Sequence, residues 1–315
     1  MKRIAIIGAT GAIGTALLDK CIDYGTEAYV FIRPESKRKE RVPQDDKIHF
    51  VSCGMKDMAA LDVADIPKID TFYQFAWTGT HGTDARNEMD DQIANIQYTI
   101  DAVRLASRLG CKTFVGAGTQ AEYGRVEGIL KPNTPCNPEN GYGMAKLCAG
   151  QMSRIECAKY GISHVWGRIV STYGPRDGDH SMVSCAIRDC LQGKVPQFTK
   201  GEQLWDYLYS GDAGEAFYRM GQSGKNGAVY VLGSGKTRTL REYIEVICNT
   251  ANPNVNPVFG TVPYMDKQVM HLQADISDLT RDTGFEPTVS FEDGIRKTVD
   301  WVKQAYENKR LDCEE

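Results

Sequence analysis

The chain has 315 residues, of which 42% are hydrophobic and 25% are charged, and its formal net charge is −4. That length allows one large domain, or two smaller ones, with a full hydrophobic core. The charge balance argues against a nucleic-acid-binding protein, and no apolar run approaches the roughly 20 residues that would span a bilayer.

The first half of the chain alternates short β-rich runs with helical stretches. Strands are predicted over residues 3–7, 28–32, 48–51, 71–75 and 113–116. Helices are predicted over residues 12–24 and 92–109, where apolar residues recur at spacings of three and four. A helix over 145–160 and a strand over 163–170 continue the alternation. This pattern predicts an α/β fold with a Rossmann-type, doubly wound parallel sheet and helices on both faces.

The second half of the chain is less regular, with loops rich in glycine and proline after residue 175. It contains one predicted strand, 228–232, and two predicted helices, 240–248 and 291–306. We expect an NAD(P)-binding Rossmann domain made of residues 1–171 and 205–232. Residues 172–204 and 233–315 would then form a smaller, partly interleaved C-terminal lobe that binds the substrate.

A glycine cluster follows the first predicted strand directly and opens the first predicted helix. Gly8, Gly11 and Gly14 have the spacing Gly-x-x-Gly-x-x-Gly, with Thr10 and Ile13 between them. Small residues let the backbone approach a pyrophosphate, and the free N–H groups at a helix N-terminus attract its negative charge. A strand, a glycine loop and a helix in this order predict a dinucleotide site.

The end of the second predicted strand bears on which dinucleotide is bound. An acidic residue there would bind the ribose hydroxyls of NAD, whereas a basic one would accept the 2′-phosphate of NADP. Arg33 stands at this position, with Ser36 and Lys37 close behind it, although Glu35 adds a negative charge nearby. We therefore favour NADP as the cofactor, with NAD as the alternative.

Tyr142 and Lys146 stand one helical turn apart in the stretch Asn-Gly-Tyr-Gly-Met-Ala-Lys that ends at residue 146. A free tyrosine has a pKa of about 10, and a nearby ammonium would favour its ionised form. Tyr142 is thus a candidate for moving a proton to or from a carbinol oxygen while a hydride moves at the neighbouring carbon. Thr119, just past the fifth predicted strand, supplies a hydroxyl to hold that oxygen.

With these motifs in this order, the chain resembles the extended short-chain dehydrogenase/reductases, the family of nucleotide-sugar epimerases, dehydratases and reductases. Besides the glycine loop, the resemblance rests on the blocks 118–124, 142–146, 168–175 and 205–212, and on the closing segments 283–287 and 294–301. It implies Thr119, Tyr142 and Lys146 as the catalytic set and places Asn95 under the active site. It also implies a homodimer formed through the helices 92–109 and 145–160, and a nucleotide-diphosphate sugar as substrate.

Further site residues follow from their places beside these motifs. Ala76 and Trp77 come just after the fourth predicted strand and are expected to line the cofactor. The candidates for contact with the substrate are His81, Gln120, Ser171, Arg176, Trp205 and Arg238. Three positions depart from the family pattern: Gly54 replaces an adenine-binding aspartate, Ser171 an asparagine and Trp205 an arginine. Trp205 is a candidate for stacking on the nucleotide base or, equally, for core packing.

The residues after Thr119 limit which reactions of the family this chain could catalyse. In the family, 4,6-dehydratases carry Asp and Glu there, decarboxylases carry a glutamate at the second position, and epimerase-reductases that make fucose nucleotides carry a cysteine at that position. This chain has Gln120 and Ala121. The resemblance therefore leaves 4-epimerisation with retained NAD, or reduction of a 4-keto-sugar by NADPH. Because Arg33 favours NADP, we favour the 4-ketoreductase; a reductase of a non-sugar carbonyl and a non-catalytic NADP sensor are further alternatives.

The ten cysteines are scattered along the chain without a Cys-x-x-Cys pair, and the five histidines are dispersed as well. We expect reduced thiols packed as small apolar residues, and no metal site. Residues 1–7 resemble the start of a signal peptide, but glycines interrupt them at once and no cleavage site follows. We therefore expect a cytoplasmic protein that binds neither nucleic acid nor membranes.

Overall fold

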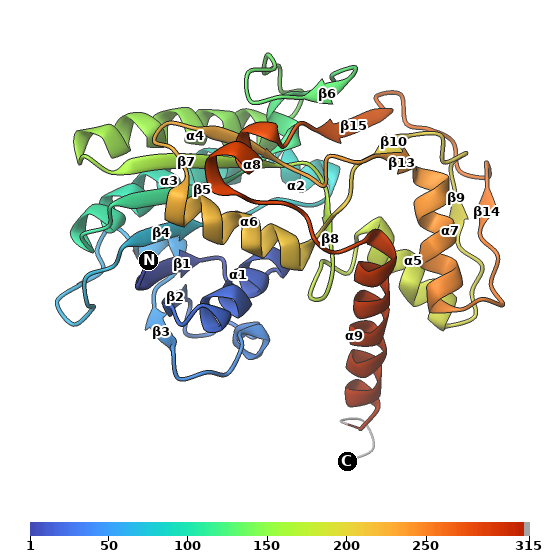
Figure 1. The fold of residues 1–315 in the computed structure, drawn as a ribbon, viewed down its shortest axis with the longest axis horizontal. Helices are drawn as coiled ribbons and strands as arrows, with labels where there is room; N and C mark the ends of the chain where they lie inside the picture. The colour runs from blue at the N-terminus through green and yellow to red at the C-terminus, as the bar shows by residue number, and fades with distance from the viewer. Residues whose placement is uncertain (312–315) are drawn as a thin grey trace.

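Seven parallel strands form the main sheet of the protein, in the order β12-β7-β5-β4-β1-β2-β3 (Figure 1). The computed structural model describes residues 1–311, and the side chains of residues 1–305. The strands are β1 (Arg3–Ile7), β2 (Glu27–Ile32), β3 (Ile48–Ser52), β4 (Thr71–Gln74), β5 (Thr113–Thr119), β7 (Ser163–Ile169) and β12 (Val229–Leu232). This sheet confirms the predicted Rossmann-type α/β fold.

Alternating side chains of the central strand β1 supply both faces of the sheet. Ile4 and Ile6 pack into the cluster that contains helices α1 (Ala12–Asp23) and α6 (Ser210–Ser223). Ala5 and Ile7 point to the opposite face, into the cluster that contains α3 (Met89–Arg108) and part of α4 (Gly141–Lys159). A strand buried on both faces reads as a continuous apolar run, which is what residues 4–7 show.

The strand β5 and the helix α4 are both longer than predicted, and this corrects the placement of two candidate catalytic residues. Thr119 is the last residue of β5 rather than a residue past it, because the strand continues through Gly116 and Gly118. Trp166 on the neighbouring strand lies across both glycines, 2.1 Å and 2.3 Å from where their side chains would begin. Tyr142 lies inside α4, which begins at Gly141.

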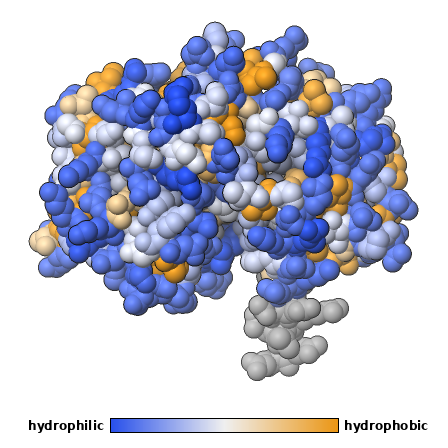
Figure 2. Space-filling model, viewed as in Figure 1, coloured by the Kyte–Doolittle hydropathy of each residue, from blue (hydrophilic) through white to orange (hydrophobic). Residues whose placement is uncertain are grey.

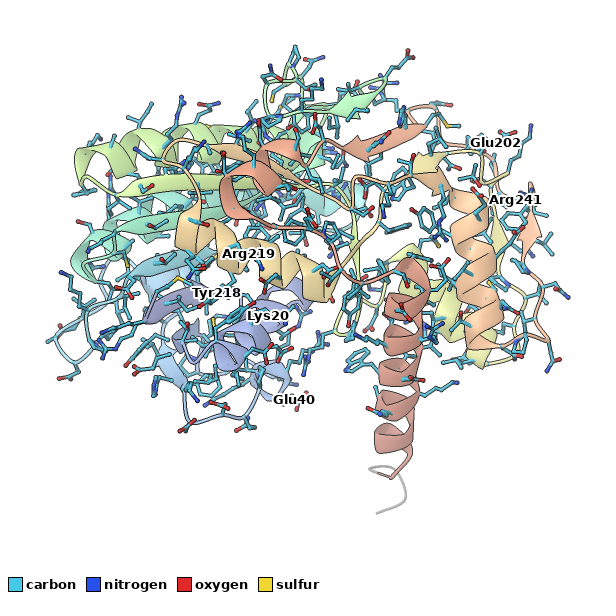
Figure 3. The ribbon with its side chains drawn as sticks, in the orientation of Figure 1. Lys20, Glu40, Glu202, Tyr218, Arg219 and Arg241 are labelled. Atoms are coloured by element: carbon cyan, nitrogen blue, oxygen red, sulfur yellow. The ribbon has the colours of Figure 1, made fainter. Side chains whose placement is uncertain are left out.

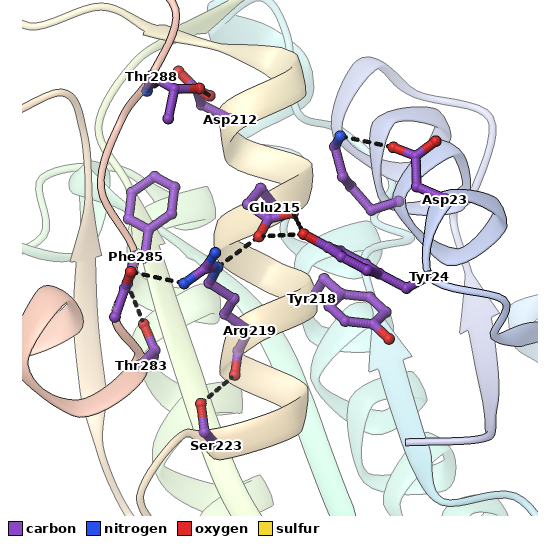
Figure 4. Close-up of polar contacts among 12 residues, drawn as sticks. Asp23, Tyr24, Asp212, Glu215, Tyr218, Arg219, Ser223, Thr283, Phe285 and Thr288 are labelled. Carbon is purple, nitrogen blue, oxygen red and sulfur yellow. Dashed lines mark hydrogen bonds and ion pairs between the residues drawn. The ribbon is translucent and has the colours of Figure 1, made fainter.

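Helix α6 is absent from the predicted elements, because glycine, serine and acidic residues dilute its apolar spacing. It packs closely on α1 at Gly214, where an added Cβ would stand 2.5 Å from the carbonyl carbon of Ala16. At the next residue of α6, the Glu215 carboxylate accepts a hydrogen bond from the Tyr24 hydroxyl and another from Arg219 Nε (Figure 4). Figure 3 shows the side chains of α1 and α6 around this seam.

Two of the segments that carry the family resemblance, 205–212 and 283–287, take part in hydrogen bonds at α6. The Asp212 carboxylate accepts hydrogen bonds from the N–H groups of Thr288 and Val289 and from the Thr288 hydroxyl (Figure 4). Arg219 donates to the carbonyl of Gly284, and Phe285 is fully buried. The segment 283–289 is thereby held across α6 and leads on to the last helix.

A second, smaller sheet builds the other lobe, in the order β13-β10-β15-β6. Its strands are β13 (Arg238–Thr239), β10 (Leu204–Trp205), β15 (His271–Ala274) and β6 (Ile129–Leu130). The helices α5 (Met182–Leu191), α7 (Leu240–Ala251) and α9 (Phe291–Leu311) pack together beside it (Figure 1). Trp205, predicted to begin the second Rossmann segment, pairs in this sheet instead. The residue-level division into domains otherwise stays a prediction.

The remaining elements are short. They are α2 (Thr83–Arg86), α8 (Ser277–Thr283), η1 (Lys39–Arg41), η2 (Met55–Asp57), η3 (Gln120–Glu122) and the strand pairs β8 (Thr172–Tyr173) with β11 (Leu208–Tyr209) and β9 (Gln197–Phe198) with β14 (Val258–Phe259). Among the described residues, no helix has both the length and the apolar character needed to cross a membrane. Figure 2 shows a mostly polar surface on this face, with apolar side chains scattered over it.

Candidate active site

The candidate catalytic residues meet where the carboxyl end of β5 contacts the first turn of α4. Asn140 caps the N-terminus of α4, and its side chain accepts a hydrogen bond of 2.8 Å from the N–H of Gly143. At Gly143 an added Cβ would stand 2.3 Å from the carbonyl oxygen of Ala121, and at Gly141 it would meet the Met89 side chain at 2.8 Å. The two glycines beside Tyr142 therefore allow this turn to pack closely on its neighbours.

Lys146 is fixed one turn further along α4. Its ammonium donates to the carbonyl of Ala117 at 2.7 Å and lies 3.8 Å from the centre of the Trp77 ring. The ammonium is also 5.9 Å from the centre of the Tyr142 ring. Burial lowers the pKa of Lys146 to about 7, because a charged amine is poorly solvated there. The lysine is thus held in place and loses its proton near neutral pH.

The Tyr142 phenol is buried, and burial raises its pKa above the ordinary value. Two nearby groups oppose this effect of burial: the Thr119 hydroxyl and the positive charge of Arg86. Glu122 acts in the other direction, since a nearby negative charge disfavours a phenolate. The structure therefore brings the predicted set of Thr119, Tyr142 and Lys146 together.

A buried carboxylate lies directly beneath these residues. Glu122 is fully buried and accepts hydrogen bonds from the N–H of Thr119, at 2.9 Å, and from Trp166 Nε1, at 3.0 Å. It also forms an ion pair of 2.6 Å with Arg168, which is itself buried and stacks over the Tyr123 ring. Glu122 thus joins the end of β5 to β7 and fixes the backbone that carries the Thr119 hydroxyl.

The loop after β4 is held by two amide side chains of α3. Trp77 Nε1 donates to Gln92 at 2.9 Å, which orients the indole over Lys146. Asn95 accepts from the N–H of Thr78 and donates to its carbonyl, at 3.0 Å and 2.9 Å. The Asn95 side chain is therefore engaged with this loop, and its predicted contact with the cofactor stays a prediction. Ala76 contacts the glycine loop, where an added Cβ on Gly8 would stand 2.3 Å from its nitrogen.

The three glycines of the first loop differ in what surrounds them. Gly8 has a φ of +92° and lies against the backbone of the β4 loop, and Gly14 lies against the backbone of Gly8 and Ala9. Gly11, by contrast, has no atom within 4 Å of the place where a side chain would begin. It precedes α1, whose first amide hydrogen bond runs from Thr15 to Gly11. The loop is therefore tight where it packs and open at the helix N-terminus, as a pyrophosphate site requires. Thr10 and Ile13, also predicted to contact the cofactor, are half-buried in this loop.

Arg33 follows β2 at the same edge of the sheet. Its side chain lies across Gly54, where an added Cβ would stand 2.8 Å from Arg33 Cγ. The absence of the aspartate usual at position 54 therefore makes room for the arginine, while Asp57 accepts from the Gly54 N–H at 2.8 Å. The backbone N–H of Ser36 donates a hydrogen bond to the Arg33 carbonyl, which forms a turn next to the exposed Lys37. Glu35 lies 3.7 Å from Arg33, with both side chains largely exposed.

Four of the six candidate substrate residues fall into two groups. Gln120 directly follows Thr119, and the His81 ring lies near Gly178, 3.7 Å from where a side chain there would begin. Trp205 and Arg238 are instead paired in the second sheet, where Arg238 binds Glu292 at 2.5 Å. The Trp205 ring packs between two apolar clusters, and its buried N–H has no partner within residues 1–305. This environment supports core packing for Trp205.

The last two candidates have partners that their sequence positions did not suggest. Burial raises the pKa of the Tyr207 phenol, and the nearby Ser171 hydroxyl opposes that effect, while the Ser171 carbonyl accepts a bond from the N–H of Leu208. Arg176 has a φ of +64° and lies 3.9 Å from Asp19 of α1. Their roles toward a substrate stay predictions.

The predicted site omits three residues that shape this geometry. Glu122 and Arg168 lie inside segments that carry the family resemblance, so a search for buried charge pairs within those segments would have found them. Arg86 comes from the loop between β4 and α3 and has no motif around it. Among the described residues there is no group of three or more His, Cys, Asp or Glu side chains placed to hold a metal ion.

Comparison with known proteins shows which family the chain resembles. The sequence model of the NAD-dependent epimerase/dehydratase family matches residues 4–233. The dTDP-glucose 4,6-dehydratase of Streptomyces griseus is 24% identical over 269 residues, or 84% of this chain and 73% of that protein. The match to the dTDP-glucose 4,6-dehydratase of Escherichia coli is 27% identical and spans only 50% of that protein.

Solved structures of similar fold cover nearly the whole chain. The UDP-glucose 4-epimerase of Thermotoga maritima, solved with UDP-glucose, is 22% identical, has a TM-score of 0.84 and matches 96% of this chain and 99% of its own. A dTDP-glucose 4,6-dehydratase from Streptomyces venezuelae, with NAD bound, is 20% identical, has a TM-score of 0.81 and matches 96% of this chain and 97% of its own. At these identities the likeness shows a common fold.

We predict that Glu122→Gln destabilises the protein by about 3–5 kcal/mol, because it leaves the buried Arg168 guanidinium without its counter-charge. The matched control is Glu139→Gln, which breaks the exposed ion pair with Arg125 and should cost less than about 1 kcal/mol. Urea unfolding of both variants measures the difference. Equal losses of stability would show that the Glu122–Arg168 pair has no special structural role.

Proposed function

The chain belongs to the NAD-dependent epimerase/dehydratase family, whose members are oxidoreductase-type enzymes, and we propose that it is an NADP(H)-dependent 4-ketoreductase of a nucleotide-linked sugar. The observation that carries this proposal is the buried Tyr142 phenol, close to the Thr119 hydroxyl and one turn from Lys146, at the carboxyl end of the central sheet. Positions 120 and 121, next to this set, bring no further acid or base.

The residues of the site divide the work of reducing a carbonyl. A bound reduced nicotinamide would supply the hydride to the carbonyl carbon. The Thr119 hydroxyl holds the carbonyl oxygen, and Tyr142 gives that oxygen a proton, which leaves a phenolate. The charge of Lys146 favours that phenolate while the ammonium stays fixed on the Ala117 carbonyl. Water then returns the proton to Tyr142.

The glycine loop and Arg33 are the groups that would hold this cofactor. The free N–H groups at the start of α1, beside the open space at Gly11, suit a pyrophosphate. Arg33 would pair with a 2′-phosphate, since a planar guanidinium binds two phosphate oxygens at once. Similar structures hold NAD, among them the Streptomyces venezuelae dehydratase, so the preference for NADP rests on Arg33 alone.

Gln120 and Ala121 weigh against 4,6-dehydration, although curated relatives carry that activity. Dehydration needs groups that move protons at two further carbons, and the family resemblance places these at positions 120 and 121. Here Gln120 has a neutral amide, and Ala121 is a buried methyl beneath the first turn of α4. Neither can exchange a proton with a sugar carbon near neutral pH.

A second candidate is an NAD-dependent 4-epimerase, because epimerisation needs no residue beyond Thr119, Tyr142 and Lys146. The full-length fold match to the Thermotoga maritima 4-epimerase supports it. The two candidates differ in cofactor use: an epimerase regenerates its NAD within each cycle, whereas a reductase consumes reduced cofactor with every product molecule.

We expect the purified protein to oxidise NADPH in the presence of a nucleotide-linked 4-keto-6-deoxysugar, with one alcohol formed per NADPH. UDP-, dTDP-, GDP- and CDP-linked substrates are each mixed with the protein, and cofactor loss is followed by absorbance while products are resolved by chromatography. Interconversion of two nucleotide hexoses without cofactor loss would support the epimerase. Cofactor binding with neither reaction would support a non-catalytic NADP sensor.

The cofactor preference is tested by Arg33→Asp, which removes the cation and puts an acid at the end of β2. Loss of one charge-assisted phosphate contact should lower the affinity for NADPH by about 10-fold or more and leave the affinity for NADH equal or higher. Binding is measured by cofactor fluorescence, with Lys39→Asp in the exposed loop beyond as a control. An unchanged ratio of the two affinities would contradict a role for Arg33.

The surface of α3 and α4 supports the expected homodimer. Six large apolar side chains are exposed on these helices or at the end of α4: Met89, Ile93, Met144, Met152, Ile155 and Tyr160. Ile93 is 64% exposed and Ile155 60% exposed, so each would lose much apolar area from water in a helix-to-helix contact. A two-fold pairing of these helices would form a four-helix interface on the face opposite α1 and α6.

We predict that the native protein sediments as a dimer and that the double variant Ile93→Asp, Ile155→Asp sediments as a monomer, because burying two carboxylates per subunit opposes association. Val258→Asp, at an exposed apolar residue of the other lobe, is the control and should remain dimeric. Analytical ultracentrifugation gives the result. A monomeric native protein, or a dimeric double variant, would contradict the proposed interface.

A further inference from the structure

A second positive charge faces Tyr142 from outside the expected catalytic set. Arg86 is the last residue of the short helix α2, and its guanidinium carbon lies 5.1 Å from the centre of the Tyr142 ring. No motif of the chain includes Arg86, and the family resemblance assigns it no role. Its position beside the phenol is created by the fold of the loop between β4 and α3.

Several contacts fix the segment that carries Arg86. Arg86 Nε donates a hydrogen bond to the carbonyl of Thr80 at 2.8 Å, which fixes the position of the guanidinium relative to the loop. Its neighbour Asn87 accepts from the N–H of Gly141 at 3.0 Å, so the end of α2 is tied to the first turn of α4. On the other side, Gln92 donates to the carbonyl of Ala85 at 3.2 Å. The arginine is therefore held at Tyr142 from both sides.

Arg86 forms no ion pair with a carboxylate among the described side chains. Within residues 1–305, no Asp or Glu oxygen lies within ion-pair distance of its guanidinium, which is half-buried. Lys146 differs, because its ammonium is buried against the Ala117 carbonyl and the Trp77 ring. A guanidinium keeps its proton throughout the pH range in which a buried lysine loses its own.

We propose that Arg86, held beside the Tyr142 ring, is a second cation of the catalytic site that stabilises the Tyr142 phenolate. The charged and titratable groups that face Tyr142 are Arg86 from α2, Lys146 from α4 and Glu122 from η3, and only Glu122 is negative. With Lys146 neutral, Arg86 is the cation that remains to offset Glu122. It thereby extends the working range of the phenol above the pH at which Lys146 deprotonates.

This inference deepens the proposed proton transfer by Tyr142, and its test does not require turnover. The protein saturated with NADP⁺ is titrated with base, and tyrosinate formation is followed by ultraviolet absorbance. The same titration of Tyr142→Phe is subtracted, so that the difference reports Tyr142 alone. Arg86→Gln and Arg86→Lys are compared with the native residue, and Arg296→Gln, which removes an exposed charge on α9, is the control.

Arg86→Gln should raise the midpoint of the Tyr142 titration by about one pH unit, a tenfold change in the ionisation constant. Arg86→Lys should recover at least half of that change, and Arg296→Gln should cause none. An unchanged midpoint in Arg86→Gln would overturn the proposal, including the case in which only the KM for a sugar rises, since that result would make Arg86 a substrate contact. A failure of the reductase assay with a shifted midpoint would count against the proposed reaction and leave this inference standing.

Discussion

The contact on which the site depends is the one between the first turn of α4 and the end of β5, closed by the hydrogen bond from the Lys146 ammonium to the carbonyl of Ala117. It places a cation inside the protein, where its burial lowers the lysine pKa, and it sets the phenol of Tyr142 beside Thr119. Gly143 is needed because a side chain at this position would stand 2.3 Å from the carbonyl oxygen of Ala121 and would push the turn away from η3. The residues of the candidate reaction are thus positioned by backbone contact rather than by long flexible side chains.

Two groups of charged side chains surround this contact. Glu122 and Arg168 form a buried ion pair that fixes the ends of β5 and β7, at the cost of burying two ions. Lys146 and Arg86 face the phenol, and neither forms an ion pair with a carboxylate among the described side chains. Glu122 is held by Arg168, Trp166 and the Thr119 N–H, but its charge still disfavours the Tyr142 phenolate, and the positive charge of Arg86 opposes it. Positive charge nearby makes it easier for a buried phenol to give up a proton.

Much of the fold follows from sequence pattern, and the exceptions have physical causes. Continuous apolar runs predict the buried parallel strands, and β1 is predicted to the residue. Helix α6 is missed because its close approach to α1 requires Gly214, a residue that lowers helix propensity. Motifs mark Thr119 and Tyr142 in the sequence, and the structure brings the two side chains close together. No pattern marks Arg86 or the Glu122–Arg168 pair, because their importance comes from contacts between segments distant in sequence. Trp205 shows the converse: a residue conspicuous by its motif position is partly buried and packs against two apolar clusters.

The central claim is that the Tyr142 hydroxyl is the proton donor, and the most direct measurement is the turnover of Tyr142→Phe with its cofactor affinity measured in parallel. The phenylalanine ring keeps the shape of the site and removes only the hydroxyl. The account predicts that kcat falls by about 100-fold or more while the dissociation constant for NADPH changes by no more than about twofold. A variant that binds NADPH normally and retains native turnover would contradict the account.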